Sequence, residues 1–182
     1  MPVEREALVR LLEEIDGWCG QQGVEGVQLV MLGGSALSLG WGSPRATKDL
    51  DVVVKGKGEL DALEQVFGRH TGRRPWLDVV LAGLPRLPEG WPSRTEPVDG
   101  TWNHISVRQL AAADLIAAKL KAFRPHDRRD IEFLCTESPD VRTALAALSA
   151  ADYWMEEDIW EEFIEPRRNR VVDYLDGVVP RL

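Results

Sequence analysis

The stretch from Leu32 to Val54 constrains the fold of this chain more than any other. It reads LGGSALSLGWGSPRATKDLDVVV, and its two aspartates, Asp49 and Asp51, stand directly before three valines. Residues i and i+2 of a β-strand point to the same face, so both carboxylates share one face of a strand that then enters a core. Two such carboxylates repel each other, and one resists ionising unless a cation neutralises the pair. We therefore predict a divalent metal ion at this end of the strand.

The turn Gly33-Gly34-Ser35, earlier in the same stretch, favours a phosphate ligand. It lies between an apolar run at 27–32, which we expect to be a buried strand, and a short helix at 35–39. Glycines let the backbone approach a ligand closely, and the first amides of a helix are available to an anion. The Ser35 hydroxyl is expected to add a bond to a phosphate oxygen. The alternative is a tight turn in which Ser35 caps the helix. The turn is not a P-loop, because no Gly-Lys-Ser/Thr follows it.

A third acidic residue, Asp78, lies in an otherwise apolar segment, WLDVVL, at 76–81. A lone aspartate in such a strand is commonly solvent-facing on a half-exposed sheet. If this strand lies beside the one that carries Asp51, Asp78 instead completes a set of three carboxylates. Three acids suit two Mg²⁺ ions, which prefer oxygen ligands together with substrate phosphates.

Apolar periodicity predicts strands alternating with helices in the first part of the chain and helices alone in the rest. Strands are expected at 27–32, 50–55, 76–82 and 102–107, and helices at 3–18, 35–39, 59–67, 110–123, 127–134, 139–150, 153–164 and 168–175. This order favours an α/β (α+β) fold, in which a small mixed sheet with flanking helices carries a C-terminal helical part. We expect residues 1–110 to form the α/β core with its N-terminal helix. Residues 111–182 are expected to form the helical part, packed on that core.

Composition narrows the classes of function. The chain has 182 residues, 44% hydrophobic and 29% charged, so a packed core is expected. Its formal net charge of −8 argues against a broad electrostatic grip on nucleic acid. Basic residues nevertheless gather in two places: Arg69, Arg73 and Arg74, and then Lys119, Lys121, Arg124, Arg128 and Arg129. A local positive patch is compatible with this acidic chain.

The cysteines and the apolar runs favour a cytoplasmic protein. Cys19 and Cys135 belong to no CxxC pair, so neither a zinc site nor a disulfide framework is indicated. The N-terminus, MPVEREALVRLLEEI, is too charged for a signal peptide. No apolar run approaches the ~20 residues that span a membrane, so no membrane partner is expected.

Taken together, these residues resemble the nucleotidyltransferase superfamily, whose motif is a glycine-glycine/serine turn, then Asp-x-Asp, then a third Asp on a later strand. The positions are occupied in order by Gly33, Gly34, Ser35, Asp49, Asp51 and Asp78. More narrowly, the chain is similar to AbiEii-type nucleotidyltransferases, the toxin components of certain toxin–antitoxin and phage-defence systems, and to their short relatives. That group has an arginine before Asp-x-Asp, a Leu-x-x-x-Lys helix and a following Asp-x-x-Asp segment. The matching residues are Arg45, Leu115 and Lys119, and Asp127 and Asp130.

The resemblance implies a nucleotidyltransferase fold and a Mg²⁺-dependent transfer of a nucleoside monophosphate from a nucleoside triphosphate, such as ATP, to an acceptor hydroxyl. Two Mg²⁺ ions held by Asp49, Asp51 and Asp78 would bind the triphosphate, and the glycine turn would hold its β and γ phosphates. Asp78 or a metal-bound oxygen would help to deprotonate the acceptor. The hydroxyl would then attack the α-phosphate in line, and Mg²⁺ would stabilise the leaving pyrophosphate.

Four residues outside this acidic motif receive supporting roles from the resemblance. It implies that Lys119 reaches the triphosphate as a point charge, and that Arg45 does the same with a bidentate grip. Asp130 is expected to orient Lys119 or an arginine. Asp127 either supports the site or simply caps the helix that follows Pro125.

Several alternatives stay open at the level of sequence. The acceptor is a tRNA end, a protein hydroxyl or a small molecule, and an antitoxin partner is compatible with the resemblance. Asp-x-Asp also binds metal–nucleotide-sugar complexes in glycosyltransferases. A nucleotide-binding module or partner protein without transfer activity is a third reading, and a structural protein with surface aspartates is a fourth.

Overall fold

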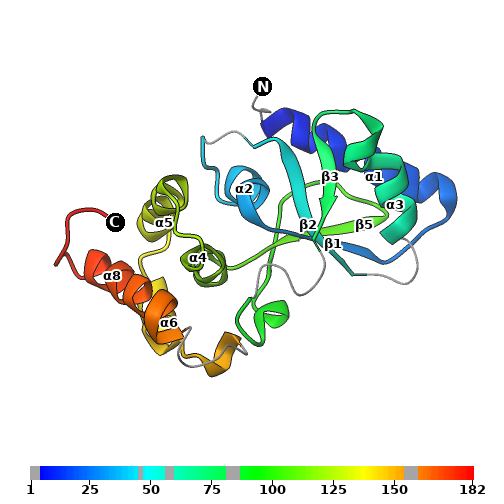
Figure 1. Ribbon diagram of the computed structural model, residues 1–182. Coiled ribbons are helices and arrows are strands. Elements are labelled where there is room, and N and C mark those ends of the chain that lie inside the picture. The colour runs from blue at the N-terminus through cyan, green and yellow to red at the C-terminus, as the bar shows by residue number, and fades with distance from the viewer. Residues whose placement is uncertain (1–4, 45–46, 56–59, 81–86, 154–159) are drawn as a thin grey trace. The chain divides into compact units, whose positions relative to one another are not determined.

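A mixed five-stranded sheet organises the first part of the chain in the computed structural model (Figure 1). The structure describes residues 5–44, 47–55, 60–80, 87–153 and 160–182. The strands are β1 (Val27–Met31), β2 (Asp49–Lys55), β3 (Trp76–Val79), β4 (Glu96–Pro97) and β5 (Ile105–Gln109). Their order in the sheet is β3-β2-β1-β5-β4. The pairs β2–β3 and β1–β5 are parallel, whereas β1–β2 and β4–β5 are antiparallel.

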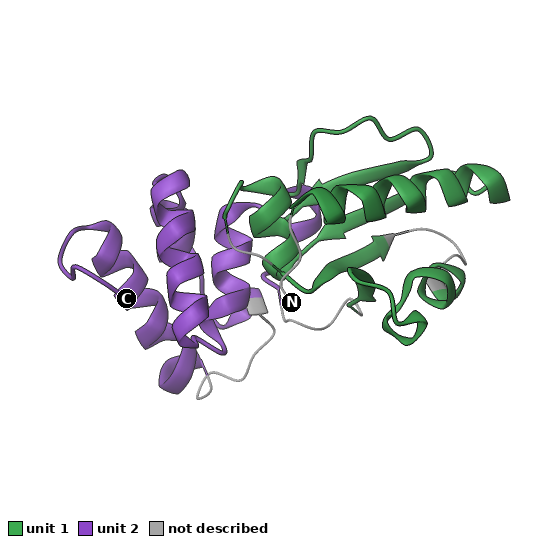
Figure 2. Ribbon diagram, turned by 90° about the horizontal axis from the view of Figure 1, so that it is seen from above, with its two compact units in different colours: residues 1–84, 95–110 green, residues 85–94, 111–182 purple. Residues whose placement is uncertain are grey.

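The chain divides into two compact units, coloured separately in Figure 2. Unit 1 comprises residues 1–84 and 95–110 and contains the five strands. Its helices are α1 (Arg5–Gln22), α2 (Gly33–Ser35), the π-helical turn η1 (Ala36–Gly40), α3 (Leu60–Phe67) and the 3₁₀ turn η2 (Arg69–Thr71). Unit 2 comprises residues 85–94 and 111–182 and is helical.

Helix α1 is anchored to unit 1 by an apolar stripe and by one buried acid. The stripe repeats at three and four residues and consists of Leu8, Leu11, Leu12, Ile15 and Cys19. The Asp16 carboxylate accepts hydrogen bonds from the backbone N–H groups of Asn103, His104 and Ile105 at 2.7 to 3.2 Å. Burial by itself raises the pKa of Asp16, but these three backbone donors hold that pKa below its ordinary value. Asp16 therefore ties α1 to the start of β5.

Side-chain alternation on β2 and β3 separates a buried face from an acidic one. Leu50, Val52 and Leu77 are fully buried. The residues that alternate with them on β2, Asp49 and Asp51, are only half-buried. Because alternate residues of a strand face opposite sides, the apolar residues anchor both strands while the acids stay accessible.

Unit 2 is a small helical assembly built around α4. Its helices are α4 (Ala112–Leu120), α5 (Pro125–Glu137), α6 (Val141–Ala147) and α8 (Glu165–Leu175), with the short turns η3 (Trp91–Ser93), η4 (Ala151–Tyr153) and η5 (Trp160–Ile164). Helix α4 contacts α5, α6 and α8. The apolar residues buried there are Leu115, Ile116, Leu120, Ile131, Leu134, Val141, Leu145, Trp160, Ile164 and Val171.

The structure confirms the α/β fold class with a C-terminal helical part. One strand boundary differs for a physical reason: β5 begins at Ile105 rather than at residue 102, because the amides of Asn103 and His104 bond to Asp16 instead of to a neighbouring strand. The two-residue β4 lies in a region expected to be a loop, and its proline is tolerated because β4 is an edge strand. Residues 3–4, 59, 81–82 and 154–159 of the expected elements lie outside the described residues. None of the described helices combines the length and apolarity needed to cross a bilayer.

Candidate functional site

Three carboxylates come together where β2 and β3 begin. The parallel register places Asp51 beside Asp78 and Asp49 beside Trp76. One carboxylate oxygen from each of Asp49, Asp51 and Asp78 lies within 4.8 Å of the others. Asp78 is exposed, whereas the other two acids are half-buried. The three acids that the sequence singled out are therefore neighbours, and their role as metal ligands stays a prediction.

The glycine turn lies against this acidic cluster. Because β1 is antiparallel to β2, with Met31 opposite Val52, the turn that follows β1 lies beside the start of β2. The Leu32 N–H donates to the Asp51 carbonyl at 2.9 Å. Gly33 has φ of +50°, and a Cβ at this position would lie 2.6 Å from Asp51 Oδ2. Only glycine satisfies both the left-handed backbone and this close approach.

The Ser35 side chain secures the turn to the strand. Ser35 is fully buried, and its Oγ lies 2.8 Å from the Leu32 carbonyl and 3.1 Å from the Asp51 carbonyl. A hydroxyl has one proton to donate, so these two carbonyls share it. Both contacts of the Ser35 hydroxyl are thus with backbone carbonyls, whereas the sequence predicted a bond to a phosphate oxygen. The backbone N–H groups of residues 33–35 belong to the first turn of a helix, where amides lack intrahelical acceptors. The phosphate role of this turn stays a prediction.

Sequence reasoning missed Thr47, which connects the turn to the acids. Its Oγ1 lies 3.3 Å from both the side-chain Oδ1 and the backbone carbonyl of Asp49, which share its one proton. A Cβ at Gly34 would lie 2.9 Å from Thr47 Oγ1. Thr47 is 9% exposed, so this contact is largely shielded from water. A signal was present in the sequence, because Thr47 precedes Asp49 by two positions and so continues the alternation of Asp49 and Asp51.

The donor set of this cluster fits a hard divalent cation. Every candidate ligand is a carboxylate oxygen, the type that Mg²⁺ prefers. The absent Cβ at Gly33 leaves room for the Asp51 carboxylate, and Thr47 donates to the Asp49 carboxylate. Hydrogen bonds of this kind orient ligating carboxylates in metal sites.

A second charged cluster lies within unit 2. Lys119 Nζ is 2.7 Å from Asp130 Oδ2 and 3.4 Å from Asp127 Oδ1, and its side chain is only 10% exposed. Asp127 Oδ2 also accepts a hydrogen bond from the Arg124 N–H at 3.0 Å, which caps the start of α5. His126 Nε2 lies 3.4 Å from Asp127 Oδ1.

The described residues implied by the resemblance form two groups, one in each unit. Lys119, Asp127 and Asp130 meet one another in unit 2, whereas the acids and the glycine turn belong to unit 1. Arg45 lies outside the described residues.

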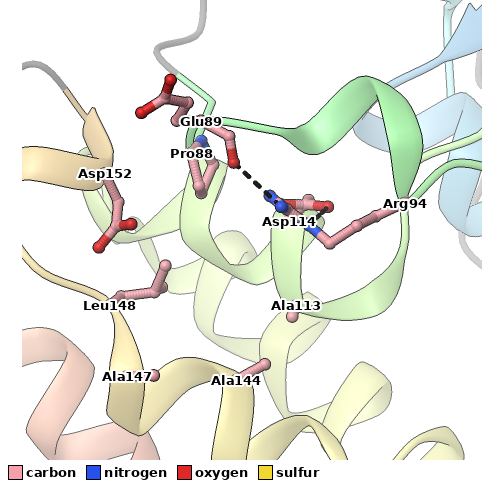
Figure 3. A pocket seen from close by; sticks show the side chains of 9 residues that line it. All are labelled: Pro88, Glu89, Arg94, Ala113, Asp114, Ala144, Ala147, Leu148 and Asp152. Carbon is pink, nitrogen blue, oxygen red and sulfur yellow. Dashed lines mark hydrogen bonds and ion pairs between the residues drawn. The ribbon is translucent and has the colours of Figure 1, made fainter.

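Unit 2 also contains a cavity of about 210 Å³, shown in Figure 3. The Arg94 guanidinium makes paired hydrogen bonds to Asp114, at 3.0 Å from Nε and 2.6 Å from Nη2, and a third bond to the Glu89 carbonyl. The bonds to Asp114 raise the pKa of Arg94 further above its ordinary value. The cavity is smaller than the roughly 300 Å³ typical of ligand sites, and Arg94 is already engaged by Asp114, so we do not consider it a candidate for the triphosphate.

Comparison with known proteins identifies the family of this chain. A search of the curated proteins and a search of the solved structures gave no significant match. The family model described as "Nucleotidyltransferase of unknown function (DUF6036)" matches residues 6–160. That range includes the glycine turn, the three acids and the Lys119 cluster. Since the match covers most of the sequence and the fold agrees with it, the chain belongs to this nucleotidyltransferase family.

Proposed function

We propose that this protein transfers a nucleoside monophosphate from a nucleoside triphosphate to an acceptor hydroxyl and that it needs Mg²⁺ to do so. The observation that supports this most is the acidic cluster at the start of β2 and β3, directly beside the glycine turn. A site for metal-bound phosphates requires both features in one place, because the carboxylates hold the cation and the amides hold the anion. Family membership agrees with this reaction class.

The three acids have distinguishable roles in this proposal. Asp49 and Asp51 are half-buried, and Asp49 is held by Thr47, so they are the fixed part of the cluster. When bound, Mg²⁺ supplies Lewis-acid polarisation of the phosphates and neutralises part of their charge. Asp78 is exposed, and we assign it the proton of the acceptor hydroxyl as well as a share of the metal.

The glycine turn contributes through its backbone. Because the Ser35 hydroxyl already bonds to backbone carbonyls, the amides of Gly33, Gly34 and Ser35 are the groups we assign to the β and γ phosphates. The hydroxyl holds the turn in place against β2. This arrangement accounts for a small buried serine after two glycines.

Lys119 is supported more strongly as a structural cation than as a phosphate ligand. Two buried carboxylates already surround its ammonium group, and their charges outnumber its own. We propose that Lys119 stabilises unit 2 by neutralising Asp127 and Asp130, and that any contact with the triphosphate is secondary. The proposal for Arg45 rests on the family resemblance.

The direct test is a thermal melt with ATP, GTP, CTP and UTP, each with and without Mg²⁺, on wild-type protein and Asp49→Asn. Asparagine keeps an acceptor for Thr47 and removes the charge. A ligand at about 100 times its Kd adds about 2.7 kcal/mol, or roughly 5–10 °C for a chain of this size. We expect a Mg²⁺-dependent shift that Asp49→Asn abolishes and that Glu64→Gln, an exposed change on α3, preserves.

Two results of this melt would contradict the proposal. Absence of a Mg²⁺-dependent shift with every triphosphate would rule out the proposed substrate class, and a shift with UDP-sugars instead would favour glycosyl transfer. A shift of equal size in Asp49→Asn would show that the acidic cluster is not part of the site.

The similarity to AbiEii-type enzymes supports, as a finer proposal, a role as the toxin of a toxin–antitoxin pair.

A further inference from the structure

We propose that the loop before β3, residues 68–75, binds the phosphodiester backbone of a nucleic-acid strand whose terminal hydroxyl is the acceptor. We refer to this segment as the arginine loop. The inference rests on the proposed function, because it names the acceptor class of that same site.

The charge of the arginine loop is opposite to that of the whole chain. The sequence of residues 68–75 is GRHTGRRP, with three arginines, one histidine and no acid, in a protein of net charge −8. Arg69, His70 and Arg74 are exposed. A polyanion approaching an acidic protein needs such a local concentration of cations, because phosphate neutralisation supplies most of its binding energy.

Two of these arginines lie close to the ring of Trp76. Their guanidinium carbons lie 5.6 Å (Arg69) and 5.8 Å (Arg74) from the centroid of the Trp76 ring. No carboxylate in the part of the chain that the structure describes forms an ion pair with either arginine. A guanidinium that stacks on an aromatic ring keeps its N–H donors in its own plane, where they fit phosphate oxygens.

Arg73 is different and serves as an internal contrast. Its guanidinium lies 5.0 Å from the Phe67 ring centroid and pairs with Glu14 of α1. Its charge is therefore already compensated within unit 1. The proposal assigns phosphate binding to Arg69 and Arg74 and assigns Arg73 to packing.

Strand register places Trp76 next to the acidic cluster. Trp76 is the register partner of Asp49, and Asp78 follows it by two positions on the same face of β3. A separate parallel bridge joins Gly68 to Leu77, the residue before Asp78. The arginine loop therefore begins alongside β3 at the level of the acids.

The arginine loop and the glycine turn lie on opposite sides of the acids. In the order β3-β2-β1, the glycine turn follows β1 and the arginine loop precedes β3, and the acids lie on β2 and β3. One anion-binding element thus stands on each side of the proposed metal ligands. We assign the triphosphate to the glycine turn, whose Gly33 touches Asp51, and the acceptor strand to the arginine loop.

The reaction at this junction is balanced with two substrates. The terminal hydroxyl oxygen of the strand forms a bond to the α-phosphorus of the triphosphate. The bond from that phosphorus to the oxygen bridging to the β-phosphorus breaks, and pyrophosphate leaves with the electron pair. The hydroxyl proton passes to a carboxylate of the cluster, to which Asp78 contributes the exposed group. The strand grows by one nucleotide.

The test measures binding of a 5′-labelled single-stranded RNA of about twelve nucleotides by fluorescence anisotropy. We compare wild-type protein with Arg69→Gln/Arg74→Gln and with Arg10→Gln, a matched loss of an exposed guanidinium on α1. Each phosphate contact on a single strand contributes about 0.7 to the slope of log K against log salt. Losing two contacts should lower that slope by about 1.4 and weaken binding roughly 50-fold at about 50 mM salt. Arg10→Gln should change affinity less than about 2-fold.

A charge-conserving variant and a second ligand separate the possible outcomes. Arg69→Lys/Arg74→Lys keeps both charges and loses the planar guanidinium groups, so its RNA affinity should lie between those of the wild type and the glutamine variant. Mg²⁺-dependent triphosphate binding should be unchanged in both variants, so that acceptor and donor sites fail separately. Equal RNA binding by wild-type and glutamine variants would overturn the acceptor assignment and leave the proposed function intact. If the glutamine variant lost triphosphate binding and kept RNA binding, Arg69 and Arg74 would belong to the triphosphate site instead.

Discussion

The two charged clusters of this protein contain similar residues and differ in how their charge is balanced. In unit 2, Lys119 lies between Asp127 and Asp130, and all three side chains are at least nine-tenths buried. In unit 1, three carboxylate oxygens lie within 4.8 Å of one another at the accessible end of two strands. Among the described residues, no lysine or arginine pairs with Asp49 or Asp78.

We propose that the cluster in unit 2 is structural and that the cluster in unit 1 binds a ligand. Buried carboxylates with an internal cation are neutralised by the fold itself, and breaking such a group is strongly destabilising. Carboxylates that lie this close repel each other, and a bound divalent cation would relieve that repulsion. The sequence alone predicts a functional role for both sets of acids, and the contacts around Lys119 support our proposal that the two sets differ in role.

The largest expected effect comes from removing the internal cation. Lys119→Met removes the cation that two buried carboxylates both contact, and we expect a loss of about 3 kcal/mol of unfolding free energy. Asp49→Asn removes one of three like charges, and in EDTA we expect the stability to be unchanged or higher by about 1 kcal/mol. Urea unfolding followed by far-UV circular dichroism measures both.

The double variant Lys119→Met/Asp130→Asn provides the control for this prediction. It also removes the charge of Asp130, so it should recover part of the unfolding free energy lost in the single variant. Lys119→Met with wild-type stability and abolished triphosphate binding would reverse the assignment and make Lys119 a nucleotide ligand.

The next largest effect is expected from alanine substitutions at two glycines, one beside the acidic cluster and one away from it. Gly33 and Gly42 both have positive φ, +50° and +69°, but a Cβ would meet Asp51 Oδ2 at 2.6 Å only at Gly33. Alanine at Gly42 should cost about 1 kcal/mol for the left-handed backbone alone. Gly33→Ala should cost about 2 kcal/mol and also weaken Mg²⁺-dependent triphosphate binding, because the methyl group displaces the Asp51 carboxylate.

Thermal melts of both glycine variants, with and without Mg²⁺ and triphosphate, test this pair. Equal ligand-induced shifts in the two variants would show that the close approach of Gly33 to Asp51 has no part in binding.

Much of the fold and the acidic part of the site could be predicted from local patterns. Strand β2 was legible because Asp49 and Asp51 precede three valines, and α1 because its leucines repeat at helical spacing. Asp78 could be paired with Asp51 only conditionally, since strand order is a long-range property that no local pattern encodes. The start of β5 was misjudged for a similar reason: the acid that binds its amides, Asp16, is more than eighty residues earlier.

Side-chain partners were the other limit of sequence reasoning. Ser35 was expected to hold phosphate with its hydroxyl, and burial has turned that hydroxyl towards the Leu32 and Asp51 carbonyls. Lys119 was expected to reach the triphosphate, and in the structure its Nζ contacts two carboxylates eight and eleven positions later in the sequence. Such assignments depend on which side chains meet after packing, and periodicity describes only the face on which each residue lies.

The smallest effect concerns the side chain that the sequence did not single out. Thr47→Val keeps the shape of the side chain and removes the hydroxyl that lies 3.3 Å from Asp49 Oδ1. Loss of a hydrogen bond that orients a metal-binding carboxylate lowers metal affinity by about 10-fold. A bond this long contributes less than about 1 kcal/mol to stability. We therefore expect the Mg²⁺ midpoint of triphosphate binding to rise about 10-fold with little change in melting temperature.

Thr47→Ser decides whether that effect belongs to the hydroxyl. Serine restores the donor and loses only a methyl group, so its Mg²⁺ titration should return to within a few-fold of wild type. If serine and valine shift the midpoint equally, the contact of Thr47 with Gly34 matters and its bond to Asp49 does not. If neither shifts it, Asp49 is oriented by the backbone of β2 alone. In that case the acidic cluster of unit 1 would need no side-chain support, in contrast to the cluster of unit 2, in which each carboxylate contacts Lys119.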